Sequence, residues 1–170
     1  MGFILRGAAA LLLLVQGGCV PAASPDEATV RADAAQGELG ARPQAVTRAA
    51  RTGLIPVENA RGRSGLIYVP ESYRPGKPAP LVVMLHGAGG TAQHSIDLAR
   101  RHADRLGFIL LAPTSAAPSW DIISRRAYGP DVSAIDGALK DLFARYSVDS
   151  KRVAIAGFSD GASYALSLGL

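Results

Sequence analysis

Cysteine is almost absent from this 170-residue sequence, and a single cysteine excludes both an internal disulfide and every metal site built from several cysteines. Dense runs of Lys and Arg are also absent. The 18 basic and 14 acidic residues give a net charge of +4 that is spread along the chain, which predicts no nucleic-acid-binding patch. Hydrophobic residues make up 48% of the sequence and exclude a wholly disordered chain, and the length suits one domain with or without an appendage.

The N-terminus lacks an apolar run long enough to cross a membrane. The run at residues 8–15 is far shorter than the roughly 20 apolar residues that a spanning helix needs. Arg6, this short apolar run and the small residues after it are typical of a secretory signal peptide, here residues 1–18. Two glycines followed by Cys19 resemble the bacterial lipoprotein signal, in which the cysteine is acylated. We therefore expect export from a bacterial cell, as a membrane-anchored lipoprotein if Cys19 is lipidated, or as a periplasmic or secreted protein if Cys19 is incidental.

Beyond the signal, the sequence divides into an Ala-rich stretch and a region of alternating strand and helix patterns. Residues 19–50 carry few large apolar side chains, so we expect a tether or a loosely ordered segment. Residues 51–170 predict an α/β fold, with a mostly parallel sheet and flanking helices. The expected strands lie at 53–57, 65–69, 81–85, 108–111 and 153–156, and the first two should form a hairpin. The expected helices lie at 92–106, at 133–146 and from 162 onward.

The segment Gly157-Phe158-Ser159-Asp160-Gly161 has the form G-x-S-x-G, and it follows a predicted strand and precedes a predicted helix. This strand–turn–helix context is what a nucleophile elbow requires. The sharp turn strains the central residue and lifts its side chain above the sheet, and residues without Cβ fit most easily on either side. We therefore predict that Ser159 is a nucleophile. The alternative is a glycine-rich loop with an incidental serine.

A second motif, His-Gly-Ala-Gly-Gly at residues 86–90, directly follows the strand predicted at 81–85. Glycines let backbone N–H groups approach a reacting oxygen, so this segment is a candidate oxyanion loop. Residues 87–92 also fit G-x-G-x-x-A, the fingerprint of a dinucleotide-binding domain. That alternative requires an acidic residue about 20 positions further on, at the end of the next strand, and residues 111–114 contain none.

With these two motifs, the run from Val148 to Ala162 looks like the elbow segment of secreted serine esterases. The sequence is similar to the phospholipase/carboxylesterase group of α/β-hydrolases and to its polyhydroxybutyrate-depolymerase-like and feruloyl-esterase-like relatives, over roughly residues 52–170. The resemblance implies hydrolysis of carboxylic esters by Ser159 without a metal or organic cofactor, and an oxyanion hole formed by the N–H groups of Ala88 and Asp160. It also implies supporting roles in the oxyanion loop and the elbow for His86, Gly87, Gly89, Gly90, Gly157 and Gly161, and structural roles for Asp149 and Arg152.

The sequence departs from the family pattern after the nucleophile. In the α/β-hydrolase fold the acid and the histidine of the triad follow the serine, but the 11 residues after Ser159 contain no histidine. The three histidines, at positions 86, 94 and 102, all precede it. We therefore expect that the chain contains only the N-terminal part of the hydrolase domain and is inactive alone. The alternative is a non-catalytic, surface-anchored binding protein that keeps the hydrolase scaffold.

Trp120 is a candidate for lining the substrate cleft, because the loop after the strand at 108–111 lies on the side where strand ends meet the active site. A tryptophan that closes the edge of the core is the alternative. The expected ligands are small-molecule or polymeric esters, and we expect no nucleic acid partner.

Overall fold

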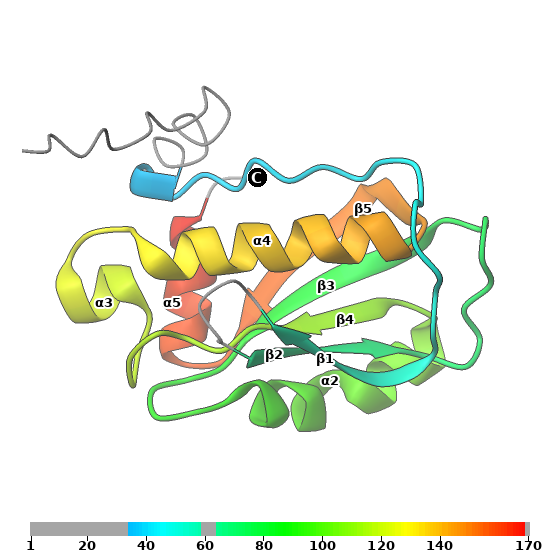
Figure 1. Cartoon of the computed structure of the whole chain (residues 1–170). Helices are drawn as coiled ribbons and strands as arrows, with labels where there is room; N and C mark the ends of the chain where they lie inside the picture. Colours follow the sequence, from blue (N-terminus) through cyan, green and yellow to red (C-terminus); the bar gives the residue numbers. More distant parts are fainter. Residues whose placement is uncertain (1–33, 59–63, 169–170) are drawn as a thin grey trace, which may run out of the picture.

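The computed structural model describes residues 34–58 and 64–168 and places a five-stranded sheet between two layers of helices (Figure 1). The predicted signal peptide, residues 1–18, and Cys19 lie outside the described residues. The strands are β1 (Gly53–Glu58), β2 (Ser64–Val69), β3 (Ala79–Leu85), β4 (Ile109–Ala112) and β5 (Val148–Gly157). The helices are α2 (Ala92–Leu106), α3 (Asp121–Arg125), α4 (Pro130–Arg145) and α5 (Asp160–Ser167).

The strands lie in the order β1-β2-β4-β3-β5. β1 and β2 form the predicted hairpin, in register from the Gly53–Val69 pair to the Glu58–Ser64 pair. β2 is antiparallel to β4, whereas β3 is parallel to both β4 and β5. Among the described strands, β2 alone therefore runs against the other four. The predicted mostly parallel sheet with flanking helices is confirmed.

Each face of the sheet is covered by an amphipathic helix. On one face, the buried residues Leu81, Val83 and Leu85 of β3 share a core with the apolar side of α4 and with α5. On the other face, Ile96 and Ala103 of α2 pack with residues of β2 and β4. The alternation along β3 thus divides its side chains between two cores, which is the expected behaviour of a central strand.

The structure adds two features that the sequence patterns did not predict. β5 begins at Val148, five residues before the strand expected at 153–156, because its first residue pairs with Ala79 before a register shift in the ladder with β3. The five-residue helix α3 is too short to produce a readable periodicity, and it ends at Arg126 in the left-handed conformation with φ of 57°.

Residues 34–50, which we call the N-terminal strap, begin with a helical turn at 34–37 and then run alongside α4 (Figure 1). Leu39 is 1% exposed, and the N–H of Ala41 donates to Asp136 Oδ1 at 2.6 Å. The N–H groups of Thr47 and Arg48 both donate to the carbonyl of residue 144 at 2.9 Å. The expectation of a loosely ordered segment therefore does not hold for the strap, because one buried leucine and backbone hydrogen bonds to α4 hold it in place. Residues 19–33 lie outside the described part of the chain.

Candidate active site

Ser159 occupies the turn between β5 and α5 with φ of 52° and ψ of −120°. A positive φ at a residue with a side chain costs on the order of 1–3 kcal/mol and persists only where the surroundings hold it. Here the N–H of Phe158 donates to the carbonyl of Leu85 at 3.0 Å, which fastens the turn to the end of β3. The Ser159 side chain is exposed. A strained, exposed serine at the end of a parallel strand is the geometry of a nucleophile elbow.

The two glycines of the elbow have no room for a side chain. A Cβ on Gly157 would lie 2.2 Å from the carbonyl carbon of Gly161, and a Cβ on Gly161 would lie 2.3 Å from the carbonyl oxygen of Leu85. Because the obstructing atoms belong to the backbone, they cannot move aside without displacing the turn. The spacing G-x-S-x-G is therefore a packing requirement of this elbow.

The glycine loop at residues 87–90 lies directly against the elbow. A Cβ on Gly87 would be 3.1 Å from Phe158 Cδ1 and 3.3 Å from Ser159 Cβ. Gly89 has φ of 66°, a conformation that favours glycine, and its N–H donates to the carbonyl of Pro118 at 2.6 Å. The structure thus brings together the two motifs, which are some 70 residues apart in the sequence.

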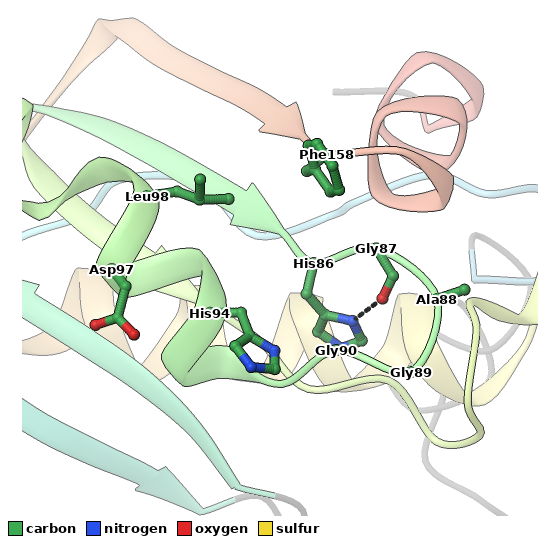
Figure 2. A pocket seen from close by; sticks show the side chains of 9 residues that line it. All are labelled: His86, Gly87, Ala88, Gly89, Gly90, His94, Asp97, Leu98 and Phe158. Carbon is green, nitrogen blue, oxygen red and sulfur yellow. Dashed lines mark hydrogen bonds between the residues drawn. The ribbon is translucent and has the colours of Figure 1, made fainter.

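His86 is fully buried, and both nitrogens of its imidazole form hydrogen bonds, of which Figure 2 shows the one to Gly87. Nε2 accepts a hydrogen bond from the N–H of Ser115 at 3.2 Å, and Nδ1 lies 2.8 Å from the carbonyl oxygen of Gly87. Both bonds form together only if the proton is on Nδ1, which then donates to Gly87. His86 is therefore a structural centre of the loop, and its ring nitrogens are not available to Ser159.

The N–H groups of Ala88 and Asp160 take no part in the hydrogen bonds that hold the two loops. The glycine loop uses the N–H groups of Gly89 and Gly90, and the elbow uses those of residues 158 and 161. Within the described part of the chain, no protein acceptor receives the N–H of Ala88 or of Asp160. Two free N–H groups on either side of a nucleophile can bind an oxyanion.

Trp120 does not line the cleft. It is 0% exposed, its ring centroid lies 4.7 Å from that of His86, and it stacks on Tyr164 at 5.1 Å with an interplanar angle of 12°. Its Nε1–H donates to the carbonyl oxygen of His86 at 2.8 Å. The alternative, a tryptophan of the core, is therefore the right one, because the loop after β4 packs this side chain between His86 and Tyr164.

A network of buried polar groups below the site was missed by the sequence analysis. Asp121 Oδ2 accepts the N–H of Asp131 at 3.0 Å, and Asp131 Oδ2 accepts the N–H of Asp121 at 2.9 Å. The hydroxyl of Tyr164 donates to Asp121 Oδ1 at 2.8 Å. Burial, and secondly this bond to a carboxylate, raise the pKa of Tyr164 well above its ordinary range. These contacts join residues 10 and 43 positions apart, so no local motif could reveal them.

Asp160 is tied to the loop between β4 and α3. Its Oδ2 accepts a hydrogen bond from Ser119 Oγ at 2.5 Å. Asp160 is also in the first turn of α5, where a carboxylate is favoured by the positive end of the helix dipole. The side chain of Asp160 thus has a structural partner, while its N–H stays free for a ligand.

A cavity of about 460 Å³ opens beside the glycine loop (Figure 2). Phe158 and Leu98 give it apolar walls and are 61% and 53% exposed. His94 also lines it, but Nδ1 of this histidine accepts the N–H of Thr91 at 3.1 Å and caps the start of α2. His102 is exposed on the same helix and contacts Arg105.

The described residues contain neither a metal-binding cluster nor a membrane-spanning helix. No cluster of three or more His, Cys, Asp or Glu side chains in residues 34–58 and 64–168 could hold a metal ion. No helix in the same residues is long and apolar enough to cross a membrane.

Comparisons with known proteins identify relatives over most of the described chain. An acetylxylan esterase from Coprinopsis cinerea is 37% identical in a match that covers 61% of this chain and 30% of the relative. The crystal structure of a thermostable esterase superposes with a TM-score of 0.52 at 22% identity, covering 66% of this chain and 35% of that one. The fold is therefore that of the α/β-hydrolases. This chain spans about a third of the length of these two proteins.

The family match rests on the region that contains both motifs. Residues 64–170 match the family described as Esterase PHB depolymerase, and this range includes the strands β2 to β5, the glycine loop and the elbow. The chain therefore belongs to the esterase PHB depolymerase family.

Proposed function

We propose that this chain supplies the nucleophile and the oxyanion hole of a serine hydrolase that cleaves carboxylic esters. The observation that carries the proposal is the strained, exposed Ser159, held against a glycine loop with the N–H of Ala88 free on one side and that of Asp160 free on the other. Membership of an esterase family and the likeness to an acetylxylan esterase support the same reaction.

In the proposed reaction, Ser159 Oγ attacks the carbonyl carbon of the ester and its proton passes to a general base. The carbonyl oxygen becomes an oxyanion, which accepts hydrogen bonds from Ala88 and Asp160. Collapse of this intermediate breaks the bond to the leaving oxygen, which takes the proton from the base and departs as the alcohol, leaving an acyl-serine that water then hydrolyses. His86 is engaged at both ring nitrogens, so we propose that the base is a histidine outside these 170 residues, oriented by an acid that is also outside them.

The cavity beside the glycine loop is the proposed binding site for one side of the ester. Its apolar walls, Phe158 and Leu98, suit an aliphatic or ring-shaped group. The names of the relatives suggest two polymeric substrates, an acetylated xylan and a polyhydroxybutyrate. Comparing release of acetate from acetylated xylan with release of hydroxybutyrate from the polyester would separate them.

Labelling with a fluorophosphonate probe tests the nucleophile. The product of the complete gene, including whatever it encodes after Leu170, should be labelled and should hydrolyse a short nitrophenyl ester. The Ser159→Ala variant should do neither. Labelling that survives this substitution would refute the assignment of Ser159. A folded complete product that is neither labelled nor active would favour a non-catalytic binding protein on a hydrolase scaffold.

We further propose that the protein is exported from a bacterial cell and that Cys19 is acylated, on the sequence pattern at residues 1–19. Mass spectrometry of the mature N-terminus tests this. An intact Met1 would contradict export. A cut at another position, leaving Cys19 unmodified, would contradict lipidation alone and leave a periplasmic or secreted protein.

A further inference from the structure

The direction of an N–H group in a trans peptide is fixed by the carbonyl of the preceding residue. No peptide bond in the described residues is cis, so each C=O points opposite to the N–H that follows it. The N–H of Asp160 is consequently aimed by the Ser159 carbonyl, and the N–H of Ala88 by the Gly87 carbonyl. What holds these two carbonyls decides where the proposed oxyanion donors point.

On the elbow side, the backbone alone holds the carbonyl. The Ser159 oxygen accepts the N–H of Ala162 at 2.9 Å and that of Ser163 at 3.2 Å. These are the first hydrogen bonds of α5, and they turn the N–H of Asp160 away from the helix. No side chain is needed to aim this donor.

On the loop side, a side chain takes part. The Gly87 oxygen accepts the N–H of Gly90 at 2.9 Å and lies 2.8 Å from His86 Nδ1 (Figure 2). We propose that His86 is a positioning residue: its Nδ1–H fixes the Gly87 carbonyl and thereby aims the Ala88 N–H at the oxyanion. This inference rests on the proposed hydrolase function, because it assigns a role within the same site.

His86 is itself held from three sides, so its ring cannot turn away from Gly87. The N–H of Ser115 donates to Nε2, the Nε1–H of Trp120 donates to the His86 carbonyl, and the Trp120 ring lies against the imidazole. Gly90 completes the enclosure, because a Cβ there would lie 3.1 Å from Nδ1 and 2.9 Å from the Gly87 oxygen. The loop therefore closes around the imidazole in a way that only glycine permits at position 90.

Two substitutions separate positioning from packing, since asparagine and glutamine each replace one ring nitrogen. The amide NH₂ of Asn reaches the position of Nδ1 and can donate to the Gly87 carbonyl. The amide oxygen of Gln reaches the position of Nε2 and can accept the N–H of Ser115, but the Gln side chain leaves the Gly87 carbonyl without this donor. In the complete gene product we expect His86→Gln to lower kcat by about 10²–10³, the usual effect of losing one oxyanion donor, with KM changed by less than about threefold. His86→Asn should retain kcat within about tenfold of the wild type. His102→Gln, at an exposed position on α2, is the control and should have wild-type kinetics.

The outcomes distinguish the inference from the function on which it rests. Rates are compared per mole of folded protein, measured by circular dichroism. Equal losses in His86→Asn and His86→Gln would show that His86 only packs, and would overturn the inference while the hydrolase assignment stands. A wild-type protein without esterase activity would overturn the hydrolase assignment instead. In that case ¹⁵N NMR of the imidazole still tests the inference, which requires a protonated Nδ1 and an unprotonated Nε2; the opposite tautomer would refute it.

Discussion

At the scale of single residues, Ser159 has a backbone conformation that its own side chain disfavours. Its φ of 52° is retained because the N–H groups of Phe158, Gly161 and Ala162 fix the turn on both sides. Strain of this kind is found at functional sites, where a residue must project from an otherwise well-packed surface. The serine therefore has an energetic cost that a glycine at the same position would avoid.

Replacement of Ser159 by glycine should stabilise the fold and abolish activity. Relief of the positive φ should raise the free energy of unfolding by on the order of 1 kcal/mol, while Ser159→Ala keeps the strain and should leave stability close to that of the wild type. Both variants lack the proposed nucleophile and should be inactive. Urea unfolding of the three proteins provides the comparison. If Ser159→Gly is no more stable than Ser159→Ala, the elbow is not strained as described.

Single residues also show how far the sequence could predict the site. The elbow at Ser159, the glycine loop and the glycines at 157 and 161 follow from short motifs, because their packing partners are near in the sequence or are other backbone atoms. Trp120 was ambiguous, since a loop position does not reveal whether the chain returns above or below the site. The hydrogen bonds of Asp121 and Tyr164 were invisible, because both partners lie in unremarkable sequence 43 residues apart.

At the scale of elements, the N-terminal strap depends on very few apolar contacts. Its buried apolar side chains are those of Leu39 and of two alanines, and Leu39 is the largest of the three. Leu39→Ala should therefore lower the free energy of unfolding by about 2–5 kcal/mol, the usual range for a buried leucine. Val46→Ala, at a position that is 44% exposed in the same strap, should cost less than about 0.5 kcal/mol. Similar effects of the two substitutions in urea unfolding would contradict the packing of the strap on α4.

The contact between α5 and α3 predicts a sensitivity to alkali. Burial raises the pKa of Tyr164, so the folded protein keeps this phenol protonated where an unfolded tyrosine, with a pKa of about 10, ionises. The protonated Tyr164 therefore makes its full contribution to the free energy of unfolding below about pH 10, and this contribution is lost as the pH rises further. Tyr164→Phe should flatten the fall in stability above pH 10. It should also cost about 1.5–3 kcal/mol at neutral pH, because Asp121 loses a donor.

Chemical denaturation at several pH values from 8 to about 11 measures both effects. A Tyr164→Phe variant with the same alkaline slope as the wild type would show that other groups cause the loss of stability. Tyr146 is the first of these to consider, because burial raises its pKa as well.

Elements were predicted best where their own sequence carries the signal. α2 has the predicted bounds because its apolar positions recur on one face and Gly107, in the left-handed conformation, ends it. The strap was misjudged because backbone hydrogen bonds to α4, which leave no trace in composition, hold it. The start of β5 was missed because the polar residues 149–152 lie in the register shift between the Val148–Ala79 and Val153–Leu81 pairs, so no strand pattern marks it.

At the scale of the whole molecule, β5 forms an edge of the sheet in the described fold. β5 is at the end of the strand order, and Leu166 of α5 is 91% exposed. An uncovered sheet edge with apolar neighbours promotes association. We therefore expect the 170-residue chain, expressed alone, to self-associate and to be inactive, while the complete gene product is soluble and active. Light scattering during gel filtration, with an esterase assay of the fractions, is the measurement; a monomeric, active 170-residue chain would contradict this.

The place of Trp120 has a further, spectroscopic consequence. It is the one tryptophan among the 170 residues, and it lies between the imidazole of His86 and the phenol ring of Tyr164. Fluorescence excited at the indole band therefore originates from a single point between His86 and Tyr164. An aromatic stack and a hydrogen-bonded Nε1–H make such emission responsive to small movements of either neighbour. In this chain the intrinsic fluorescence is thus a local optical reporter of the glycine loop and the elbow helix, obtained without attaching a dye.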